Sequence, residues 1–325
     1  MKRFAHFLWL FGLFFFSWVG FAKETTGACV AALEKLNHQI ERNFFETRRD
    51  FHKYVETFPG TLFRDLSRLS VDGHWVDAGS GEGFALQDFY NRVVFDPEKA
   101  IRNAEPSFWV PRRINLDRAL IREAGNTLNQ KVPQDRGRIT GVTYKMEREA
   151  PKIEGLRLLS GRFFEEIPNQ EISSADIITD LYGVMSYSPR VDKVLSKYHS
   201  ILKKGGRAYI FIGDYVESPD FTLSLRAMPH QESGWDSPFA LSKVKKKNGE
   251  TVSLLEWVMA IPGFKATLQA NEVEPQPRAG VIPGVIQRTT LVLEKADEIT
   301  RIPSLRLLEA DEGKPPLRFF EEVSD

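Results

Sequence analysis

The stretch HWVDAGSGEG, residues 74–83, decides the fold. Apolar residues lead into Asp77, and glycine then occupies every second position at Gly79, Gly81 and Gly83. A short apolar run that ends in glycines predicts a strand followed by a tight turn, and the segment FALQDFYNR after it predicts a helix. A glycine turn between a strand and a helix lets a ligand approach the backbone and its free amides.

The rest of the central chain repeats this alternation of strand and helix. Further strands are predicted in RITGVTYKM, LRLLSGRFF, ADIITDLY and RAYIFIG, and a helix in PRVDKVLSKYHSILKKGG, with Gly205 and Gly206 capping its end. A helix in SLLEWVMAIPGF then precedes two strands, KATLQANEV and VIQRTTLVLEK. Alternating strands and helices predict a parallel sheet with right-handed crossovers, and two successive final strands predict an antiparallel pair.

The remaining segments set the domain organisation. We expect a signal peptide over 1–22, a helical cap over 23–70, the main domain over 71–297 and an extended tail over 298–325. Two insertions, 91–137 and 214–250, interrupt the main domain. The first contains a predicted helix, NLDRALIREAGNTLNQ, and in the second Asn248 and Gly249 predict a hairpin.

Composition excludes several classes of function. Lys and Arg number 44, equal to Asp and Glu, so no nucleic-acid partner is indicated by bulk charge. The only cysteine is Cys29, which excludes an intramolecular disulfide and a thiolate metal cluster. The six histidines have no metal-ligand spacing, so no metal site is predicted.

The spacing D-x-G-x-G-x-G from Asp77 to Gly83 resembles motif I of the class I S-adenosylmethionine-dependent methyltransferases. RITGVTYKMER looks like the second strand of that family, LLSGRFFEEIP like its third strand and the following loop. The run from ADIITDLY to RAYIFIG is similar to its fourth strand, fourth helix and fifth strand. The resemblance implies a Rossmann-like α/β fold, with a seven-stranded, mostly parallel sheet, helices on both faces and an antiparallel last strand.

The resemblance also implies roles for individual residues. Asp180 and Tyr182, at the tip of the fourth strand, would be catalytic and face the transferred methyl group, and Tyr187 would shape the same pocket through its ring face. The cofactor, S-adenosylmethionine, would be bound by nine residues: Asp77, Ala78, Gly79, Ser80, Gly81, Gly83, Thr143, Arg162 and Asp180.

Alternatives stay open at several of these positions. The family places an acid at the end of the second strand to hold the ribose, where this chain has Thr143; Glu147 is one substitute. Asp96 is another, if RVVFDPEKA is the second strand instead. Asp180 is either a base or the cap of a turn, and Tyr182 is either a pocket residue or packed in the core.

We therefore expect an S-adenosylmethionine-dependent methyltransferase acting on an unknown acceptor. The alternative is an exported, non-catalytic binding module that keeps the methyltransferase fold. A dinucleotide is disfavoured because Phe84 stands where such sites need a small residue, and no G-x-S-x-G elbow of a hydrolase is present.

The first residues have the three parts of a secretory signal. Lys2 and Arg3 precede an apolar segment, and Gly20 and Ala22 supply small residues before a cleavage site at Lys23. We expect export to the periplasm or to the medium. The alternative is that residues 4–22 stay attached as a membrane anchor, and no other contact with a membrane is predicted.

N-terminal sequencing of the protein from a fractionated native host checks this expectation. The mature chain should begin at Lys23 and lie outside the cytosol. A chain beginning at Met1 in the cytosolic fraction would contradict export.

Overall fold

The computed structural model describes part of the chain. The described residues are 49, 51–69, 72–88, 109–111, 139–143, 156–172, 174–217, 242–275, 285–296, 301–310 and 317–324. The predicted signal peptide and anchor, most of both insertions, and the helix predicted within 91–137 lie outside them.

Eight strands form the larger sheet, in the order β2-β9-β10-β6-β5-β1-β3-β4. The strands β4, β3, β1, β5 and β6 run parallel, whereas β10 runs antiparallel to β6 and to β9. The predicted Rossmann-like sheet of seven mostly parallel strands with an antiparallel last strand, β10, is confirmed, and β2 adds an antiparallel edge beside β9. The strands are β1 (Trp75–Ala78), β2 (Trp109–Pro111), β3 (Ile139–Thr143), β4 (Leu156–Ser160), β5 (Ala175–Asp180), β6 (Leu202–Glu217), β9 (Phe264–Pro275) and β10 (Val285–Lys295).

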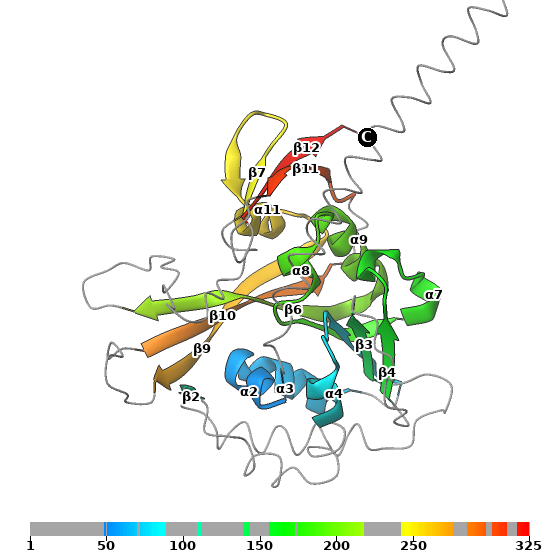
Figure 1. Ribbon diagram of the computed structural model, residues 1–325, viewed down its shortest axis with the longest axis vertical. Coiled ribbons are helices and arrows are strands. Elements are labelled where there is room, and N and C mark those ends of the chain that lie inside the picture. Colours follow the sequence, from blue (N-terminus) through cyan, green and yellow to red (C-terminus); the bar gives the residue numbers. More distant parts are fainter. Residues whose placement is uncertain are drawn as a thin grey trace, which may run out of the picture. The chain divides into compact units, whose positions relative to one another are not determined.

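Helices cover both faces of this sheet (Figure 1). Alternation along β1 places Trp75 in one core with α2, α3 and α4, and Val76 in the other core with α8, α9 and α11. None of the helices in the described ranges is long and apolar enough to cross a membrane. The helical elements are α2 (Phe51–Thr57), α3 (Gly60–Ser67), α4 (Phe84–Asp88), the 3-10 helix η3 (Phe164–Glu166), α7 (Asn169–Ile172), α8 (Val184–Tyr187), α9 (Val191–Ile201) and α11 (Leu254–Met259).

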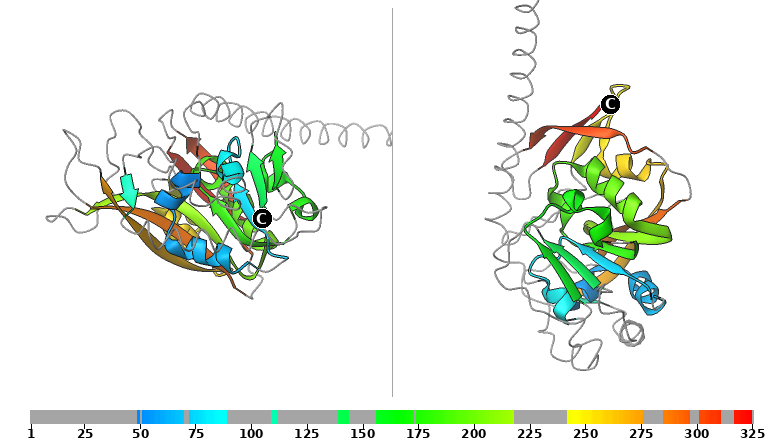
Figure 2. Two further views of the ribbon diagram at one scale, coloured as in Figure 1. Left: turned by 90° about the horizontal axis from the view of Figure 1, so that it is seen from below. Right: turned by 90° about the vertical axis from the view of Figure 1, so that its right-hand side faces the viewer.

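The C-terminal residues form strands in a second sheet. The sequence predicted an extended tail over 298–325, but β11 (Ser304–Ala310) and β12 (Arg318–Val323) pair with each other, and β12 pairs with β7 (Lys243–Lys245). Together with β8 (Thr251–Ser253) they make a four-stranded sheet (Figure 2). Phe320 anchors it, because this side chain is fully buried in the core that contains α9.

The hairpin predicted from its turn residues is confirmed. β7 and β8 run antiparallel, and the turn between them contains Asn248 and Gly249. The Oδ1 atom of Asn248 accepts a hydrogen bond from the amide of Glu250 at 3.0 Å, and Gly249 has a φ of 87°. A glycine at that position avoids the steric cost of positive φ.

The glycine cap predicted for α9 is wrong. The helix ends at Ile201, and Leu202 continues in an extended conformation, with φ −65° and ψ 134°, paired with Ala175. Leu202 is buried, so apolar packing stops the helix before the glycines. Gly205, with φ 73°, lies instead where the pairing register of β5 and β6 shifts.

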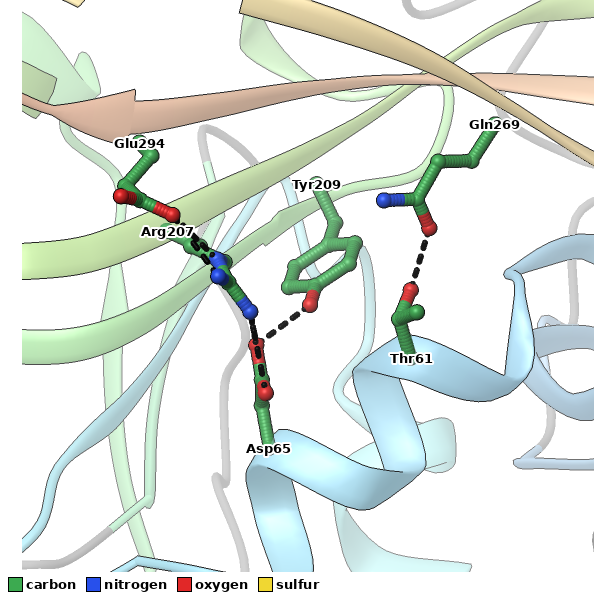
Figure 3. Close-up of polar contacts among 6 residues, drawn as sticks. All are labelled: Thr61, Asp65, Arg207, Tyr209, Gln269 and Glu294. Atoms are coloured by element: carbon green, nitrogen blue, oxygen red, sulfur yellow. Dashed lines mark hydrogen bonds and ion pairs between the residues drawn. The ribbon is translucent and has the colours of Figure 1, made fainter. Parts of the chain in front are cut away.

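A polar cluster holds α3 on the sheet (Figure 3). Arg207 of β6 donates to Asp65 of α3 at 3.0 Å and to Glu294 of β10 at 2.7 Å. Tyr209, two residues along β6, donates to the same Asp65 carboxylate at 2.5 Å. Burial and the Asp65 charge raise the pKa of Tyr209, so this hydroxyl remains a donor at neutral pH. The cluster therefore joins a helix and two strands that are far apart in sequence.

Replacing Arg207 by Met keeps the aliphatic stem but removes both ion pairs. We expect the free energy of unfolding to fall by about 1 kcal/mol, because the partly exposed network is screened by solvent. Urea unfolding followed by circular dichroism measures the change. The control Lys245→Met removes a single pair with Glu321 of 3.3 Å on the small sheet and should cost less. Equal losses in the two variants would contradict a networked role for Arg207.

Candidate functional site

The strand order reverses beside β1. The chain proceeds from β1 outward to β3 and β4, then returns to the other side of β1 as β5 and continues to β6. In open α/β sheets the loops at such a reversal separate and leave room for ligands at the carboxyl ends of the strands. The candidate site is therefore formed by the loops after β1 and β5 and by the end of β3.

The loop after β1 has the conformation that its glycines predict. Gly79, Gly81 and Gly83 have φ values of 92°, 58° and 75°, which other residues rarely adopt. The amides of Gly79 and Ser80 donate to the carbonyl of Val142, at 3.0 and 2.8 Å, so the loop folds onto the end of β3. The α4 helix begins directly after this loop, as expected.

Protein atoms fill the space that a side chain would need at two of these glycines. A Cβ on Gly79 would stand 2.3 Å from the Cα of Gly183, in the loop after β5. A Cβ on Gly183 would in turn stand 2.1 Å from the carbonyl oxygen of Ala78. Gly83 faces Leu158 of β4, where the closest atom would be 2.9 Å away. Packing within the protein, against the other loop at Gly79 and against Leu158 at Gly83, therefore accounts for both glycines without any ligand.

Asp180 caps the loop after β5. Its carboxylate accepts hydrogen bonds from the amides of Gly183 and Met185, each at 2.8 Å, and from the hydroxyl of Tyr198 at 2.6 Å. The side chain is 1% exposed, and burial raises the pKa of Asp180 to about 6. These contacts favour the turn-capping alternative over a catalytic base, because both oxygens are already occupied.

Asp77 is occupied in a similar way. Its Oδ1 atom accepts from the hydroxyl of Thr179 at 2.8 Å, and its Oδ2 atom accepts from the hydroxyl of Tyr54 at 2.6 Å. The carboxylate is fully buried, and burial raises the pKa of Asp77 to about 6. Because Tyr54 belongs to α2, this bond ties the helical cap to the end of β1.

Both buried acids make stability depend on pH. Their folded-state pKa values, about 6, exceed the ordinary value of 3.8. The protonated forms are therefore favoured by folding, and the stability that this gives is complete below about pH 4 and lost as the pH rises through 6. At neutral pH the hydrogen bonds to each carboxylate offset part of the cost of burying its charge.

The predicted aromatic residues lie in the loop after β5 and in the short helix α8 that follows it. Tyr182 has a φ of 48°, an uncommon conformation for a residue with a side chain, and its ring meets Phe211 edge-on at 4.9 Å. Tyr187 ends α8, and burial raises the pKa of its hydroxyl. Both side chains are half-buried, so each contributes to the core and to the surface of the loop.

Thr143 is the last residue of β3, next to the carbonyl that holds the glycine loop. It is 2% exposed, and its Oγ1 atom has no hydrogen-bond partner among the described residues. The register that would use Asp96 is wrong, because β3 and β5 already occupy both sides of β1. Asp96 and Glu147 themselves lie outside the described residues.

Arg162 lies apart from these residues. Its side chain is 48% exposed in the turn after β4, and Nη1 contacts both carboxylate oxygens of Glu171 at 2.8 Å. The structure therefore gives Arg162 a surface ion pair. Of the predicted site residues, Asp77, the glycine loop, Thr143 and Asp180 do lie close together.

Sequence reasoning missed two buried arginines. Arg49, which precedes α2, is 7% exposed, and its Nε and Nη1 atoms have no partner among the described residues. Arg318 of β12 is 1% exposed. Its guanidinium donates to the carbonyl of Met185, in α8, at 2.9 Å and to the carbonyl of Ser188, directly after α8, at 2.6 Å. Burial lowers the pKa of Arg318 to about 9. Neither position has a local pattern that distinguishes it from a surface arginine.

Comparisons with known proteins give only distant structural likeness. No family model and no curated protein matches the chain significantly. Among solved structures, the chain is similar to the type IIG restriction endonuclease BpuSI, with 10% sequence identity and a TM-score of 0.33. The match covers 78% of this chain and 27% of that one, so the chain spans about a quarter of its length. The fold assignment therefore rests on the strand order of the sheet.

The contact between the two loops can be tested at Gly79. We expect Gly79→Ala to lower the free energy of unfolding by about 3 kcal/mol or more, because the new methyl group meets backbone atoms and φ is positive. Gly205→Ala is the control: its φ is 73°, but nothing lies within 4 Å of the added Cβ. It should cost about 1 kcal/mol. Similar losses in chemical denaturation would show that the loops do not touch.

Proposed function

We propose that this protein binds S-adenosylmethionine at the carboxyl ends of β1, β3 and β5 and transfers its methyl group to an acceptor. The observation that carries the proposal is the glycine loop placed at the reversal of strand order, with the loop after β5 against it. The sequence motifs that resemble the methyltransferase family fall on β1, β3, β4, β5, α9 and β6, which supports the proposal.

The residues at the site fit the cofactor in part. The unpartnered hydroxyl of Thr143 can make one hydrogen bond to a ribose hydroxyl, which supports the nucleoside half of the proposal. The backbone of Gly81 and its neighbours would lie along the methionine part. Arg162 does not fit its predicted role in cofactor binding, because it is exposed and paired with Glu171.

The bound cofactor would supply a sulfonium whose methyl carbon is attacked in line by the acceptor. The chain needs to align the two reactants and exclude water. Tyr182 and Tyr187 would line the acceptor side and favour a cation through their ring faces. Asp180 would hold the loop in position by accepting hydrogen bonds from the amides of Gly183 and Met185. The acceptor would lose its proton to solvent or to a residue other than Asp180.

The second candidate is an exported binding module without turnover. It is favoured by the observation that protein groups satisfy both Asp77 and Asp180, and that packing explains Gly79 and Gly83. Export would also separate the protein from the cytosol, where S-adenosylmethionine is made. In the enzyme, the insertions at 91–137 and 214–250 would contribute to the binding of the acceptor.

Calorimetric titration of the full chain tests the proposal. We expect binding of S-adenosylmethionine and S-adenosylhomocysteine at micromolar to millimolar concentration. Thr143→Val should weaken binding of both about fivefold to tenfold, because one hydrogen bond is lost. Absence of heat with either ligand at millimolar concentration would reject the cofactor.

A matched variant on the same strand controls for stability. Thr140→Val removes a hydroxyl that lies 2.8 Å from Nε2 of His74, away from the glycine loop, so it should change the melting temperature but not the affinity. Appearance of S-adenosylhomocysteine from S-adenosylmethionine, in the presence of amine, hydroxyl and thiol acceptors, separates the enzyme from the binding module.

A further inference from the structure

Arg49 is a buried cation with unpartnered donor atoms. The side chain is 7% exposed, and Nε and Nη1 are both buried with no hydrogen-bond partner in the described part of the chain. Burying an unpaired charge costs several kcal/mol, and buried donors without acceptors add to that cost. Such a group is stable where an anion joins it. The arginine therefore indicates a ligand that brings a negative charge.

The position of Arg49 is fixed by the helix that follows it. Arg49 stands two residues before α2, and α2 is held at the end of β1 by the 2.6 Å bond from Tyr54 to Asp77. Burial raises the pKa values of Asp77 on β1 and Tyr187 on α8, and the positive charge of Arg49 opposes that rise at both groups. The position of α2 and these charge effects therefore both indicate that Arg49 lies toward the carboxyl ends of β1 and β5.

The two buried carboxylates at this end of the sheet, Asp77 and Asp180, make their hydrogen bonds with other groups. Asp77 accepts its hydrogen bonds from Tyr54 and Thr179. Asp180 accepts from two backbone amides and from Tyr198. Arg49 is absent from both sets of donors, so its unpartnered nitrogen atoms stay available to an acceptor that comes from outside the protein.

We propose that Arg49 binds the carboxylate of the ligand at the carboxyl ends of β1 and β5. The inference rests on the proposed function, because S-adenosylmethionine and S-adenosylhomocysteine each carry one carboxylate at the end of the amino-acid part. A guanidinium makes charge-assisted hydrogen bonds with a carboxylate, and these are stronger than neutral ones. The ligand would then lie with its nucleoside toward Thr143 and its carboxylate toward α2.

A pair of ligands isolates the carboxylate. S-adenosylhomocysteine and 5′-methylthioadenosine share the nucleoside and the thioether, but only the first has the amino-acid part. In calorimetric titrations, Arg49→Gln should weaken S-adenosylhomocysteine about tenfold to a hundredfold and leave methylthioadenosine within about twofold. Arg49→Lys should fall between Arg49→Gln and the parent chain, because it keeps the charge but not the planar donor set. Arg306→Gln removes a positive charge on the small sheet and should change neither affinity.

Stability of the protein without ligand gives an independent result. If Arg49 has no partner within the protein, Arg49→Gln should leave the melting temperature unchanged or raise it, because an unpaired buried charge is removed. A melting temperature lowered by more than about 5 °C would mean that the guanidinium is paired within the chain, and would overturn the inference.

The outcomes separate the two proposals. A parent chain that binds neither nucleoside ligand rejects the proposed cofactor, and with it this carboxylate. A parent chain that binds S-adenosylhomocysteine, with equal affinity in Arg49→Gln, supports the proposed function and rejects the role of Arg49. Equal losses for both ligands would show that Arg49 shapes the nucleoside site and would also reject the carboxylate. Tight binding of inorganic phosphate that depends on Arg49, with unchanged S-adenosylhomocysteine, would assign the arginine to a different anion.

Discussion

The close approach of two backbone segments, at Gly79 and Gly183, is the constraint on which the rest of the site depends. Neither position has room for a Cβ, because each would meet backbone atoms of the other loop. The carboxylate of Asp180 accepts a hydrogen bond from the amide of Gly183, and the carbonyl of Val142 accepts one from the amide of Gly79. The ends of β1, β3 and β5 are therefore packed into one unit, and the proposed ligand would meet a surface that this packing has already formed.

Two tyrosines connect that unit to the helices on opposite faces of the sheet. Tyr54 reaches Asp77 from α2, in one core, and Tyr198 reaches Asp180 from α9, in the other. Each carboxylate loses its hydration on burial, and the hydrogen bond that replaces part of it also positions a helix. Arg318 adds a third connection, because its bonds to α8 join the small sheet to the same loop. A shift of α2, α9 or the small sheet would therefore move Tyr54, Tyr198 or Arg318 and, through its hydrogen bonds, the site.

Much of the fold could be predicted from local patterns. The apolar run of β1, its glycine turn and the alternation that follows fix the order of elements, and Asn248 with Gly249 fixes a hairpin. The end of α9 and the strands β11 and β12 could not be predicted, because Leu202 and Phe320 are decided by burial against distant segments. Partners of Asp77 and Asp180, up to 102 residues away, leave no local signal either.

The glycine motif shows why a site is harder to predict than a fold. Positive φ and loop packing already require glycine at 79 and 83, so the spacing specifies a loop conformation whether or not a ligand binds. What internal packing leaves unexplained carries more functional weight. In the described structure, the hydroxyl of Thr143 and the guanidinium of Arg49 are buried, polar and without partners at this edge of the sheet. Selection for stability alone would tend to remove such groups, since each costs free energy that an apolar replacement would recover. The proposed ligand, with both a hydroxyl-bearing part and an anionic part, would supply a partner for each of these two groups.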